Sequence, residues 1–455
     1  MVKISVIGCG YLGAVHAASM AKLGHEVIGI DLDADKVAAL NAGTPAFFEP
    51  GLRAALASAR KRGSLTFSTR MEDAAGSQVH FVAVGTPQRK DSDAADLRFV
   101  DAAFESLLPF LRAGNLVVGK STVPVGTAAR LDLLVRSAAV DAILAWNPEF
   151  LREGFAVKDT VAPDRLVYGV PGGPDGERAV ALLDEIYAGA LARKTPRLVV
   201  DFATAELVKV AANAFLATKI SFINAMAEIA EATGADVTSL ADALGHDRRI
   251  GRKFLNSGLG FGGGCLPKDI RAFRARAEEL GVGDSVAFLG EMDAINLRRR
   301  DRMVELAVDS LEGDVRGKRI AILGLAFKPK SDDVRDAPAL AVAARLIEAG
   351  ASVVGTDPQA LETARRALPG LELAKTPAAA VAEADIVLLL TEWKEYRDLV
   401  PAELAGARGR ILLDGRNCVK REIWRESGWT VRSLGRPDVA IPRSTRLSEQ
   451  LAPAN

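Results

Sequence analysis

The sequence has few cysteines and few histidines. It contains Cys9, Cys265 and Cys418 and four histidines among 455 residues. The cysteines lie far apart and form no C-x-x-C pair, which argues against a disulfide framework. Neither paired cysteines nor an H-E-x-x-H pattern is present, so no metal site is predicted. The chemistry of this chain is therefore expected to need no metal ion.

An excess of charge of one sign is also lacking. Lys plus Arg and Asp plus Glu number 58 each, so no net field attracts nucleic acid or an anionic membrane. No apolar run approaches the eighteen or so residues of a membrane span, and the first ten residues resemble a strand entering a glycine loop rather than a targeting segment. We expect a cytoplasmic protein that binds neither nucleic acid nor membrane.

Two regions alternate short β-branched runs with helical stretches. This pattern, over residues 2–200 and again from about residue 319, is typical of parallel sheets covered by helices. Between them, residues 204–233 predict one long helix with Thr204 as its N-cap. Its apolar residues occupy nearly every face, as in a helix buried between domains or subunits. We predict an α/β protein with two open Rossmann-like α/β domains, joined by a long central helix with a helical middle domain. The expected boundaries are 1–200 for a nucleotide-binding domain, 201–312 for the central domain, 313–435 for the C-terminal α/β domain and 436–455 for a tail.

A glycine motif follows the first predicted strand. Gly8, Gly10 and Gly13 stand between an apolar strand and a helix, where glycines permit a tight turn and close approach of a pyrophosphate. Asp31 ends the next strand, where an acid accepts both ribose hydroxyls and repels a ribose phosphate. A glycine turn without a ligand is the alternative, but this context predicts NAD rather than NADP.

Cys265 lies between a glycine run and a predicted helix. Pro267 suits the first position of that helix, which places the thiol just ahead of its positive end. A helix end contributes on the order of 0.3 to 1 kcal/mol, and one pKa unit corresponds to about 1.4 kcal/mol, so Lys268 or Lys209 must help to ionise the thiol. A lone cysteine is ordinarily a small buried hydrophobe. The glycine run and the Lys268–Asp269 pair favour a nucleophile instead.

Lys209 and Asn213 lie four residues apart on the predicted long helix and therefore share a face. Asn224 falls near the same face. Polar stripes are ordinarily solvated, but these residues have apolar neighbours, which favours an internal site. There an amine and an amide could stabilise an alkoxide or oxyanion.

Further polar side chains follow predicted strands. Glu149 and Glu153 come after one strand, and Thr86 and Thr122 come after two others. Ligands of open α/β sheets bind at the carboxyl ends of the strands, so we expect these side chains near the nicotinamide. A salt bridge is the alternative role for either carboxylate. The basic segments 248–253 and 327–330 are either solvated faces or contacts to a second nucleotide diphosphate.

Taken together, these motifs resemble those of a known family. GCGYLG, KSTVPVGT, NPEFLREG, KVAANAFLATKISFINAMAEI, GFGGGCLPKD, GLAFKPKSDDVRDAP and DGRN occur in the order found in the UDP-glucose 6-dehydrogenases of the UDP-glucose/GDP-mannose dehydrogenase family. The resemblance covers nearly the whole chain apart from the tail. It implies an NAD domain, a central helix that forms a homodimer or higher homo-oligomer, and a C-terminal UDP-sugar domain. It also implies a four-electron oxidation of UDP-glucose to UDP-glucuronate with two NAD.

The resemblance also implies residue roles. Cys265 would be the nucleophile, Lys209 and Asn213 would steady the oxygen at C6, Asp269 and Thr122 would handle protons and water, and Glu153 would act in acyl hydrolysis. The expected cofactor contacts are Gly8, Gly10, Tyr11, Leu12, Gly13, Asp31, Lys36, Thr86, Thr122, Glu153, Lys268 and Arg335. The expected substrate contacts are Glu149, Phe150, Leu151, Lys209, Asn213, Arg249, Phe261, Gly262, Lys328 and Arg416, with Arg249 reaching from a partner subunit.

Three alternatives remain at this stage. A two-electron hydroxyacid dehydrogenase would combine a nucleotide fold with a catalytic lysine, but it gives no role to Cys265. A dehydrogenase for GDP-mannose or another nucleotide sugar would keep most of the motifs. A non-catalytic NAD-sensing or scaffold protein would keep the glycine loop and Asp31, but it has no use for a thiol beside Lys268 and Asp269.

Overall fold

The computed structural model describes residues 1–137 and 141–437. Their contacts group them into two compact units. The first comprises residues 1–218, 262–293 and 326–336, and the second comprises residues 219–261, 294–325 and the chain from 337 onward. The predicted tail lies almost wholly in residues 438–455, outside the described residues.

The first unit contains an eight-stranded sheet in the order β3-β2-β1-β4-β5-β6-β7-β8. Neighbouring strands pair in parallel except β6 and β7, whose pairing of Trp146 with Gly169 is antiparallel. The predicted parallel sheet is therefore correct apart from this pair. The strands are β1 (Lys3–Ile7), β2 (Glu26–Ile30), β3 (Leu65–Ser68), β4 (Val79–Val82), β5 (Leu116–Gly119), β6 (Ile143–Trp146), β7 (Leu166–Gly169) and β8 (Arg197–Val200).

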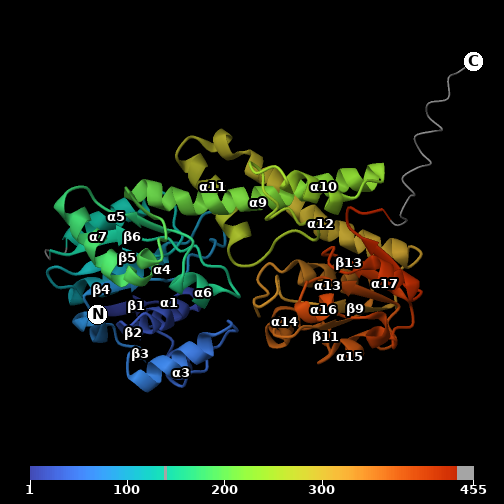
Figure 1. The fold of residues 1–455 in the computed structure, drawn as a ribbon, viewed down its shortest axis with the longest axis horizontal. Coiled ribbons are helices and arrows are strands. Elements are labelled where there is room, and N and C mark those ends of the chain that lie inside the picture. Colours follow the sequence, from blue (N-terminus) through green and yellow to red (C-terminus); the bar gives the residue numbers. More distant parts are fainter. Residues whose placement is uncertain (138–140, 438–455) are drawn as a thin grey trace, which may run out of the picture. The chain divides into compact units, whose positions relative to one another are not determined.

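Helices cover both faces of this sheet (Figure 1). One buried cluster includes Val15 of α1 and Leu56 of α3, and the other includes Phe104 of α4 and Leu131 of α5. Because both faces are covered, the central strands β4 to β7 are buried at every position and largely apolar. The helices are α1 (Tyr11–Lys22), α2 (Ala34–Asn41), α3 (Leu52–Arg62), α4 (Arg98–Leu107), α5 (Thr127–Ser137), α6 (Ala156–Val161), α7 (Pro174–Ile186) and α8 (Ala188–Ala192), with short 3-10 turns at Met71–Gly76 and Leu108–Phe110.

The predicted long helix is α9 (Phe202–Thr233), which contributes residues to both units. Thr204 is not its N-cap: the Asp201 carboxylate accepts the Thr204 N–H and hydroxyl at 2.8 and 2.9 Å, so the helix starts earlier than predicted. The helix is not buried on every side either, because Phe215, Phe222 and Ile229 are exposed. It is followed by α10 (Val237–Gly245), α11 (Leu266–Glu279), a 3-10 turn at Gly283–Val286 and α12 (Phe288–Ser310).

Helix α9 is also long and apolar enough to cross a membrane by composition alone. Two of its polar side chains, Glu206 and Asn213, are buried and bond to neighbouring elements of the first unit. Such contacts are typical of a core helix in a soluble protein.

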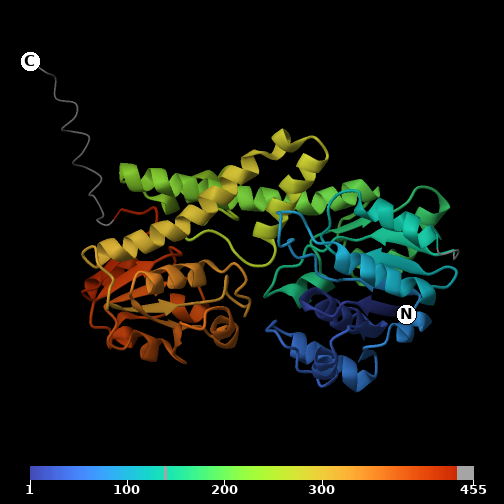
Figure 2. The ribbon, with the colours of Figure 1, turned by 180° about the vertical axis from the view of Figure 1, so that it is seen from behind.

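The second unit contains a six-stranded parallel sheet in the order β11-β10-β9-β12-β13-β14. In Figure 2 this region of the chain is orange to red, with helices packed beside the strands. The strand order is that of a dinucleotide-binding fold, and the first six strands of the other sheet repeat it. The predicted second α/β domain is thereby confirmed. The strands are β9 (Arg319–Leu323), β10 (Ser352–Thr356), β11 (Glu372–Leu373), β12 (Ile386–Leu389), β13 (Ile411–Asp414) and β14 (Thr430–Ser433); the helices are α13 (Pro338–Glu348), α14 (Leu361–Ala367), α15 (Pro377–Val381), α16 (Lys394–Arg397) and α17 (Arg421–Glu426), with a 3-10 turn at Pro401–Leu404.

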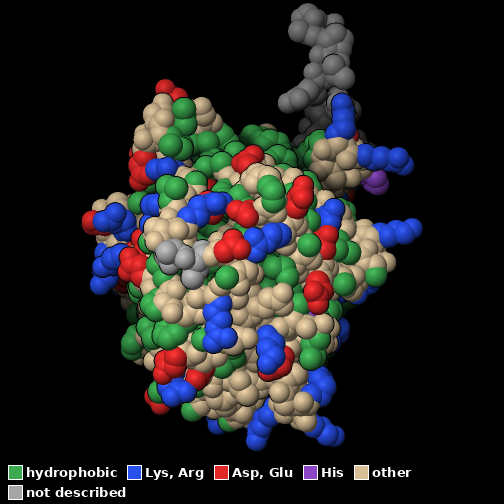
Figure 3. Space-filling model, turned by 90° about the vertical axis from the view of Figure 1, so that its left-hand side faces the viewer, with side chains coloured by type: hydrophobic (Ala, Val, Ile, Leu, Met, Phe, Trp, Pro, Cys, Tyr) green, Lys and Arg blue, Asp and Glu red, His purple; other side chains and the backbone are tan. Residues whose placement is uncertain are grey.

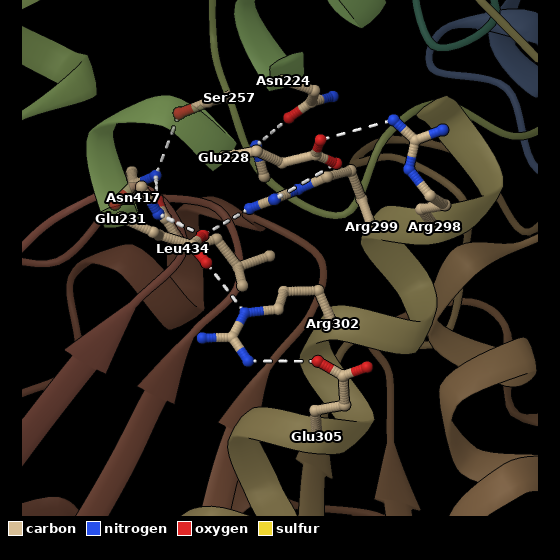
Figure 4. Close-up of polar contacts among 12 residues, drawn as sticks. Asn224, Glu228, Glu231, Ser257, Arg298, Arg299, Arg302, Glu305, Asn417 and Leu434 are labelled. Atoms are coloured by element: carbon tan, nitrogen blue, oxygen red, sulfur yellow. Dashed lines mark hydrogen bonds and ion pairs between the residues drawn. The ribbon is translucent and has the colours of Figure 1, made fainter. Parts of the chain in front are cut away.

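A charged network joins α9, α12 and the chain after β14 within the second unit (Figure 4). Glu231 accepts from Arg299 at 2.8 Å, from Arg302 at 2.7 Å and from the Gly435 N–H at 2.9 Å. Arg299 is fully buried. Because a buried charge needs a partner, Glu231 fixes where α12 and residue 435 lie against α9.

Surface charge is mixed in sign. On the face shown in Figure 3, Lys and Arg side chains are interspersed with Asp and Glu. This distribution agrees with the equal totals of basic and acidic residues in the sequence.

Candidate active site

The glycine loop joins β1 to α1. Gly8 has a φ of +86°, and a Cβ on Gly13 would lie 1.8 Å from the Gly8 carbonyl oxygen, so both positions require glycine. A Cβ on Gly10 would meet nothing within 4 Å, which leaves open space at the N-cap of α1. Tyr11 and Leu12 form the first turn, and Leu12 packs against the core. An open glycine at a helix N-terminus fits a pyrophosphate.

Asp31 follows β2 beside this loop. Its carboxylate accepts the Cys9 N–H at 2.8 Å and the Asp33 N–H at 3.1 Å. Lys36 of α2 donates to both carboxylate oxygens at 2.9 and 3.0 Å. The acid is thus held at the edge of the glycine loop with a cation beside it, an arrangement suited to ribose hydroxyls.

Cys265 is the N-cap of α11, one position closer to the helix than the sequence predicts, because the helix begins at Leu266 and Pro267 occupies its second position. The Cys265 side chain reaches solvent. The crowding of protein atoms around it nevertheless raises the pKa of the thiol, and the negative charges of Asp269 and Glu153 raise it further. The positive charges of Lys209 and Lys268 oppose this shift. The thiol therefore lies within the field of four charged residues predicted for the site.

Asp269 connects α11 to α9. Its buried carboxylate accepts from the Asn213 amide at 2.7 Å and from the Lys268 ammonium at 2.6 Å. Lys268 also donates to the Thr86 hydroxyl at 3.4 Å, and that hydroxyl donates to the Thr122 carbonyl at 2.8 Å. Five predicted site residues thus form one chain of hydrogen bonds.

Lys209 lies one turn before Asn213 on α9. Its ammonium is 5.5 Å from the centre of the Phe150 ring, on which the Arg165 guanidinium also lies at 3.8 Å. Phe150 and Leu151 are half-buried and pack against the two core clusters. Asn224 does not join this group, because its side chain is buried in the second unit and accepts the Gly258 N–H at 2.9 Å.

Glu153 is a buried carboxylate beside the segment 328–335. The Ser331 hydroxyl donates to it at 3.2 Å, and the Arg335 guanidinium lies 3.6 Å away. Burial raises the pKa of Glu153, and the charge of Asp333 adds to this effect. Lys328 and Arg335 act in the opposite direction on that pKa. A carboxylate with a raised pKa is a stronger base than an exposed one, which suits proton abstraction from water.

Glu149 makes different contacts. It forms an ion pair of 3.1 Å with Lys120, whose side chain is buried, and it accepts the N–H groups of Phe150 and Leu151 at 2.8 and 2.9 Å. Lys120 donates further to Asn147 at 3.0 Å. The carboxylate therefore orders the loop that leads to Glu153.

The glycines directly before Cys265 pack against the segment that carries Lys328 and Arg335. The Gly263 N–H donates to the Arg335 carbonyl at 2.9 Å, and a Cβ on Gly263 would lie 2.7 Å from the Phe327 ring. A Cβ on Gly264 would lie 2.4 Å from the Arg335 guanidinium carbon. Burial lowers the pKa of Lys328, and the negative charge of Glu153 opposes that change. The close packing of Gly263 and Gly264 against the segment 327–335 thus brings Lys328 and Arg335 near Cys265.

Three predicted substrate residues belong to the second unit. Arg249 is exposed and pairs with Asp247 at 2.6 Å. Phe261 is buried, and its N–H and carbonyl bond to the Asn296 amide at 2.7 and 3.0 Å. Arg416 donates to the Gly260 carbonyl at 3.0 Å.

Three models of the UDP-glucose/GDP-mannose dehydrogenase family match the chain: the NAD binding domain at residues 2–190, the central domain at 203–298 and the UDP binding domain at 321–421. The chain belongs to the UDP-glucose/GDP-mannose dehydrogenase family. It is therefore an NAD-dependent oxidoreductase of the nucleotide-sugar dehydrogenases, which confirms the predicted family, fold class and enzyme class.

Individual relatives match nearly the whole chain. The UDP-glucose 6-dehydrogenase of Rhizobium meliloti is 42% identical over 96% of this chain and 100% of its own length. That of Pseudomonas aeruginosa is 38% identical over 96% of this chain and 98% of its own length. The solved UDP-glucose dehydrogenase of Pyrobaculum islandicum is 40% identical, covers 93% of this chain and 96% of its own, and has a TM-score of 0.85.

Within this family fold, sequence reasoning missed two buried groups of the site. These are Lys120, which directly follows β5, and Glu49, which lies in the turn before α3. Lys120 is 3% exposed and Glu49 is 5% exposed. The one available signal was a charged residue beside a strand end or a turn, and most such residues are solvated.

Proposed function

We propose that this chain oxidises UDP-glucose to UDP-glucuronate in a four-electron reaction with two NAD, and that Cys265 is the covalent nucleophile. The observation that carries the proposal is the position of Cys265 at the N-cap of α11, in the field of Lys209, Lys268, Asp269 and Glu153. A two-electron hydroxyacid dehydrogenase or a scaffold would have no use for this arrangement.

Similarity to the relatives favours UDP-glucose over GDP-mannose as the substrate. The solved GDP-mannose dehydrogenase of Pseudomonas aeruginosa is 31% identical, covers 92% of this chain and 97% of its own, and has a TM-score of 0.51. The Pyrobaculum islandicum UDP-glucose dehydrogenase is more similar in both respects, at 40% and 0.85. The match to a UDP binding domain supports the same choice.

The glycine loop and Asp31 would hold NAD. The open space at Gly10 fits the pyrophosphate, and Asp31 and Lys36 would hold the adenosine ribose. Thr86, Thr122, Lys268, Glu153 and Arg335 would line the nicotinamide end. When bound, NAD accepts one hydride in each of the two oxidations.

Cys265 acts between the two oxidations. Its sulfur forms a bond to the aldehyde carbon at C6, which gives a thiohemiacetal whose oxygen takes the negative charge. Lys209 and Asn213 face this oxygen as donors, since the Asn213 bond to Asp269 uses only one of its two amide hydrogens. The second oxidation converts the thiohemiacetal into a thioester on Cys265.

Hydrolysis of the thioester releases the product. A water molecule gives its proton to Glu153 and adds its oxygen to the acyl carbon. The bond from carbon to sulfur then breaks, and the thiolate of Cys265 is restored. Asp269 and Thr122 assist as relays for protons and water, because Thr122, Lys268 and Asp269 line one common hollow.

Substrate binding and assembly complete the proposal. Lys328, Arg416 and, from a partner subunit, Arg249 would hold the diphosphate and sugar, with Phe150, Leu151, Phe261 and Gly262 around them. The exposed Phe215, Phe222 and Ile229 repeat every seven residues on α9 and so share one face, which supports a homodimer through this helix. We place the enzyme in the cytoplasm.

The stoichiometry of NADH tests the proposal. At limiting UDP-glucose, absorbance should show two NADH per sugar. Cys265→Ser should stall after partial oxidation, whereas Cys418→Ser, which alters a half-buried thiol of the second unit, should keep two NADH per sugar. One NADH per sugar in the wild type, or unchanged turnover in Cys265→Ser, would contradict the proposal.

A substrate panel tests the sugar nucleotide. We expect UDP-glucose to give the highest kcat/KM among UDP-glucose, UDP-galactose, UDP-N-acetylglucosamine and GDP-mannose. A higher kcat/KM for GDP-mannose would contradict UDP-glucose as the substrate and favour the GDP-mannose alternative.

A further inference from the structure

Glu49 is a buried carboxylate with no role in the steps above. It lies just before α3, and its two carboxylate oxygens accept three hydrogen bonds. One oxygen accepts from the Tyr11 hydroxyl and from the Gly154 N–H, the latter at 2.7 Å, and the other accepts the Ala156 N–H at 2.7 Å. Both oxygens are therefore used, and all three donors lie far from Glu49 in the sequence.

Two of these donors belong to the chain that follows Glu153. Gly154 has a φ of +79°, and a Cβ there would lie 2.8 Å from the Lys330 Cβ, so the backbone passes close to the segment 328–335. The Gly154 N–H also lies 3.3 Å from the Tyr11 hydroxyl oxygen. Because Glu49 holds the peptide groups directly after Glu153, it sets the direction in which the Glu153 side chain leaves the backbone.

The neighbouring residue extends the connection. The Phe48 N–H donates to the Asp332 carboxylate at 2.9 Å, and Ser331 donates to Glu153 itself at 3.2 Å. On the other side, Tyr11 begins α1 directly after the glycine loop that fits the pyrophosphate, and the centre of its ring lies 4.9 Å from that of Phe47. Residues 47–49 thus join the glycine loop, the Glu153 backbone and the segment 328–335.

We propose that Glu49 is a positioning residue for thioester hydrolysis, because it holds Glu153 in place as the base. Through Tyr11, it also connects the position of Glu153 to the glycine loop. This inference rests on the proposed function. It predicts a defect in one step of the reaction, because the two oxidations use Cys265, Lys209 and Asn213, whose contacts do not include Glu49.

Glu49→Gln is the first test. A glutamine side chain has nearly the same volume as glutamate but only one acceptor oxygen. Its NH2 group would face one of the two backbone N–H groups, so the hydrogen bond to Gly154 or to Ala156 is lost. A displacement of about 1 Å in a catalytic group can cost on the order of 100-fold. We expect the steady-state kcat to fall about 10- to 100-fold, while the first-turnover burst of two NADH per active site persists. Intact mass spectrometry of quenched enzyme should show the acyl group on Cys265.

Asp236→Asn is the matched control. Asp236 is also a partly buried capping carboxylate, accepting the Thr238 and Ser239 N–H groups at the N-terminus of α10, but it lies in the second unit. It should lower the Tm without changing the ratio of burst to steady-state rate. If Glu49→Gln likewise leaves that ratio unchanged, or if burst and kcat fall together, the proposal is overturned.

Tyr11→Phe provides a second test that removes only one hydroxyl, should Glu49→Gln fail to fold. We expect a higher KM for NAD together with a several-fold slower hydrolysis and a measurable acyl-enzyme. A change in the KM for NAD alone would overturn the link through Tyr11. Failure of the proposed function is distinguishable, because the wild type would then form no Cys265-dependent second NADH.

Discussion

The Asn213 amide donates to the Asp269 carboxylate over 2.7 Å and so ties α9 to the first turn of α11, directly after Cys265. This contact gives Asp269 two opposite effects on the reaction. Its negative charge raises the pKa of the Cys265 thiol, and its hydrogen bonds hold Asn213 and Lys268 in place.

Asp269→Asn should therefore separate thiol reactivity from turnover. Loss of the negative charge lowers the pKa of Cys265, so the rate of alkylation by iodoacetamide at pH 7.5 should rise several-fold while kcat falls by at least about 100-fold. Asp293→Asn, which removes a carboxylate bonded to Arg271 of α11 at 2.9 Å, should change neither rate appreciably. Unchanged or slower alkylation in Asp269→Asn would contradict this account.

Asp31→Asn should relax the choice of cofactor. A hydrogen bond to a charged group contributes about 1.5 to 3 kcal/mol, so we expect kcat/KM for NAD to fall about tenfold or more. The ratio of kcat/KM for NADP to that for NAD should rise by at least as much, because the repulsion of a ribose phosphate is removed. Asp33→Asn is the control, since asparagine still caps α2 where Asp33 accepts the Lys36 N–H at 3.0 Å. An unchanged ratio in Asp31→Asn would rule out this role.

Glu206 should make stability depend on pH. Its buried carboxylate accepts the Gly126 and Ala128 N–H groups at 2.7 and 2.6 Å, yet burial outweighs these bonds and raises its pKa to about 7. A raised pKa means that the folded state favours the protonated acid, so the stabilisation is complete below the unfolded pKa of about 4.5 and is lost as pH rises through about 7.

Thermal and urea unfolding at pH 5.5 and pH 8 measure this dependence. The contribution of Glu206 should be on the order of 2 kcal/mol larger at the lower pH, given about 1.4 kcal/mol per pKa unit. Glu206→Gln should flatten that part of the pH dependence. If the free energy of unfolding changes between pH 5.5 and pH 8 by the same amount in the wild type and in Glu206→Gln, Glu206 does not cause the pH dependence.

Arg299→Met should destabilise the second unit strongly. Arg299 is fully buried and bonds to Glu231, so its removal breaks a buried ion pair and leaves a partly buried carboxylate with only Arg302 as its remaining charged partner, at a cost of about 3 kcal/mol. The adjacent Arg298 has a side chain 51% exposed and bonds to Glu228 at 3.3 Å, so Arg298→Met should cost no more than about 1 kcal/mol. Urea denaturation compares the two variants, and similar losses would contradict the structural distinction.

Local patterns in the sequence predicted much of the architecture. The glycine loop, Asp31, the long helix and the place of Cys265 before a helix all follow from residues close together in the chain. Backbone hydrogen bonding repeats over a few residues, so periodicity and capping residues indicate such elements directly. Even here the predicted N-cap was wrong, because the helix begins at Phe202 and the Asp201 carboxylate accepts the Thr204 N–H.

Contacts between residues that lie far apart in the sequence could not be predicted from the sequence. The antiparallel pairing of β6 with β7, the chain of bonds from Asn213 through Asp269 and Lys268 to Thr86, and the three donors around Glu49 all join separate segments. Only the folded chain brings these groups together, because burial and charge pairing depend on which side chains become neighbours. The sequence determined the elements and the candidate nucleophile, and the tertiary structure decided which buried carboxylates hold the site in place.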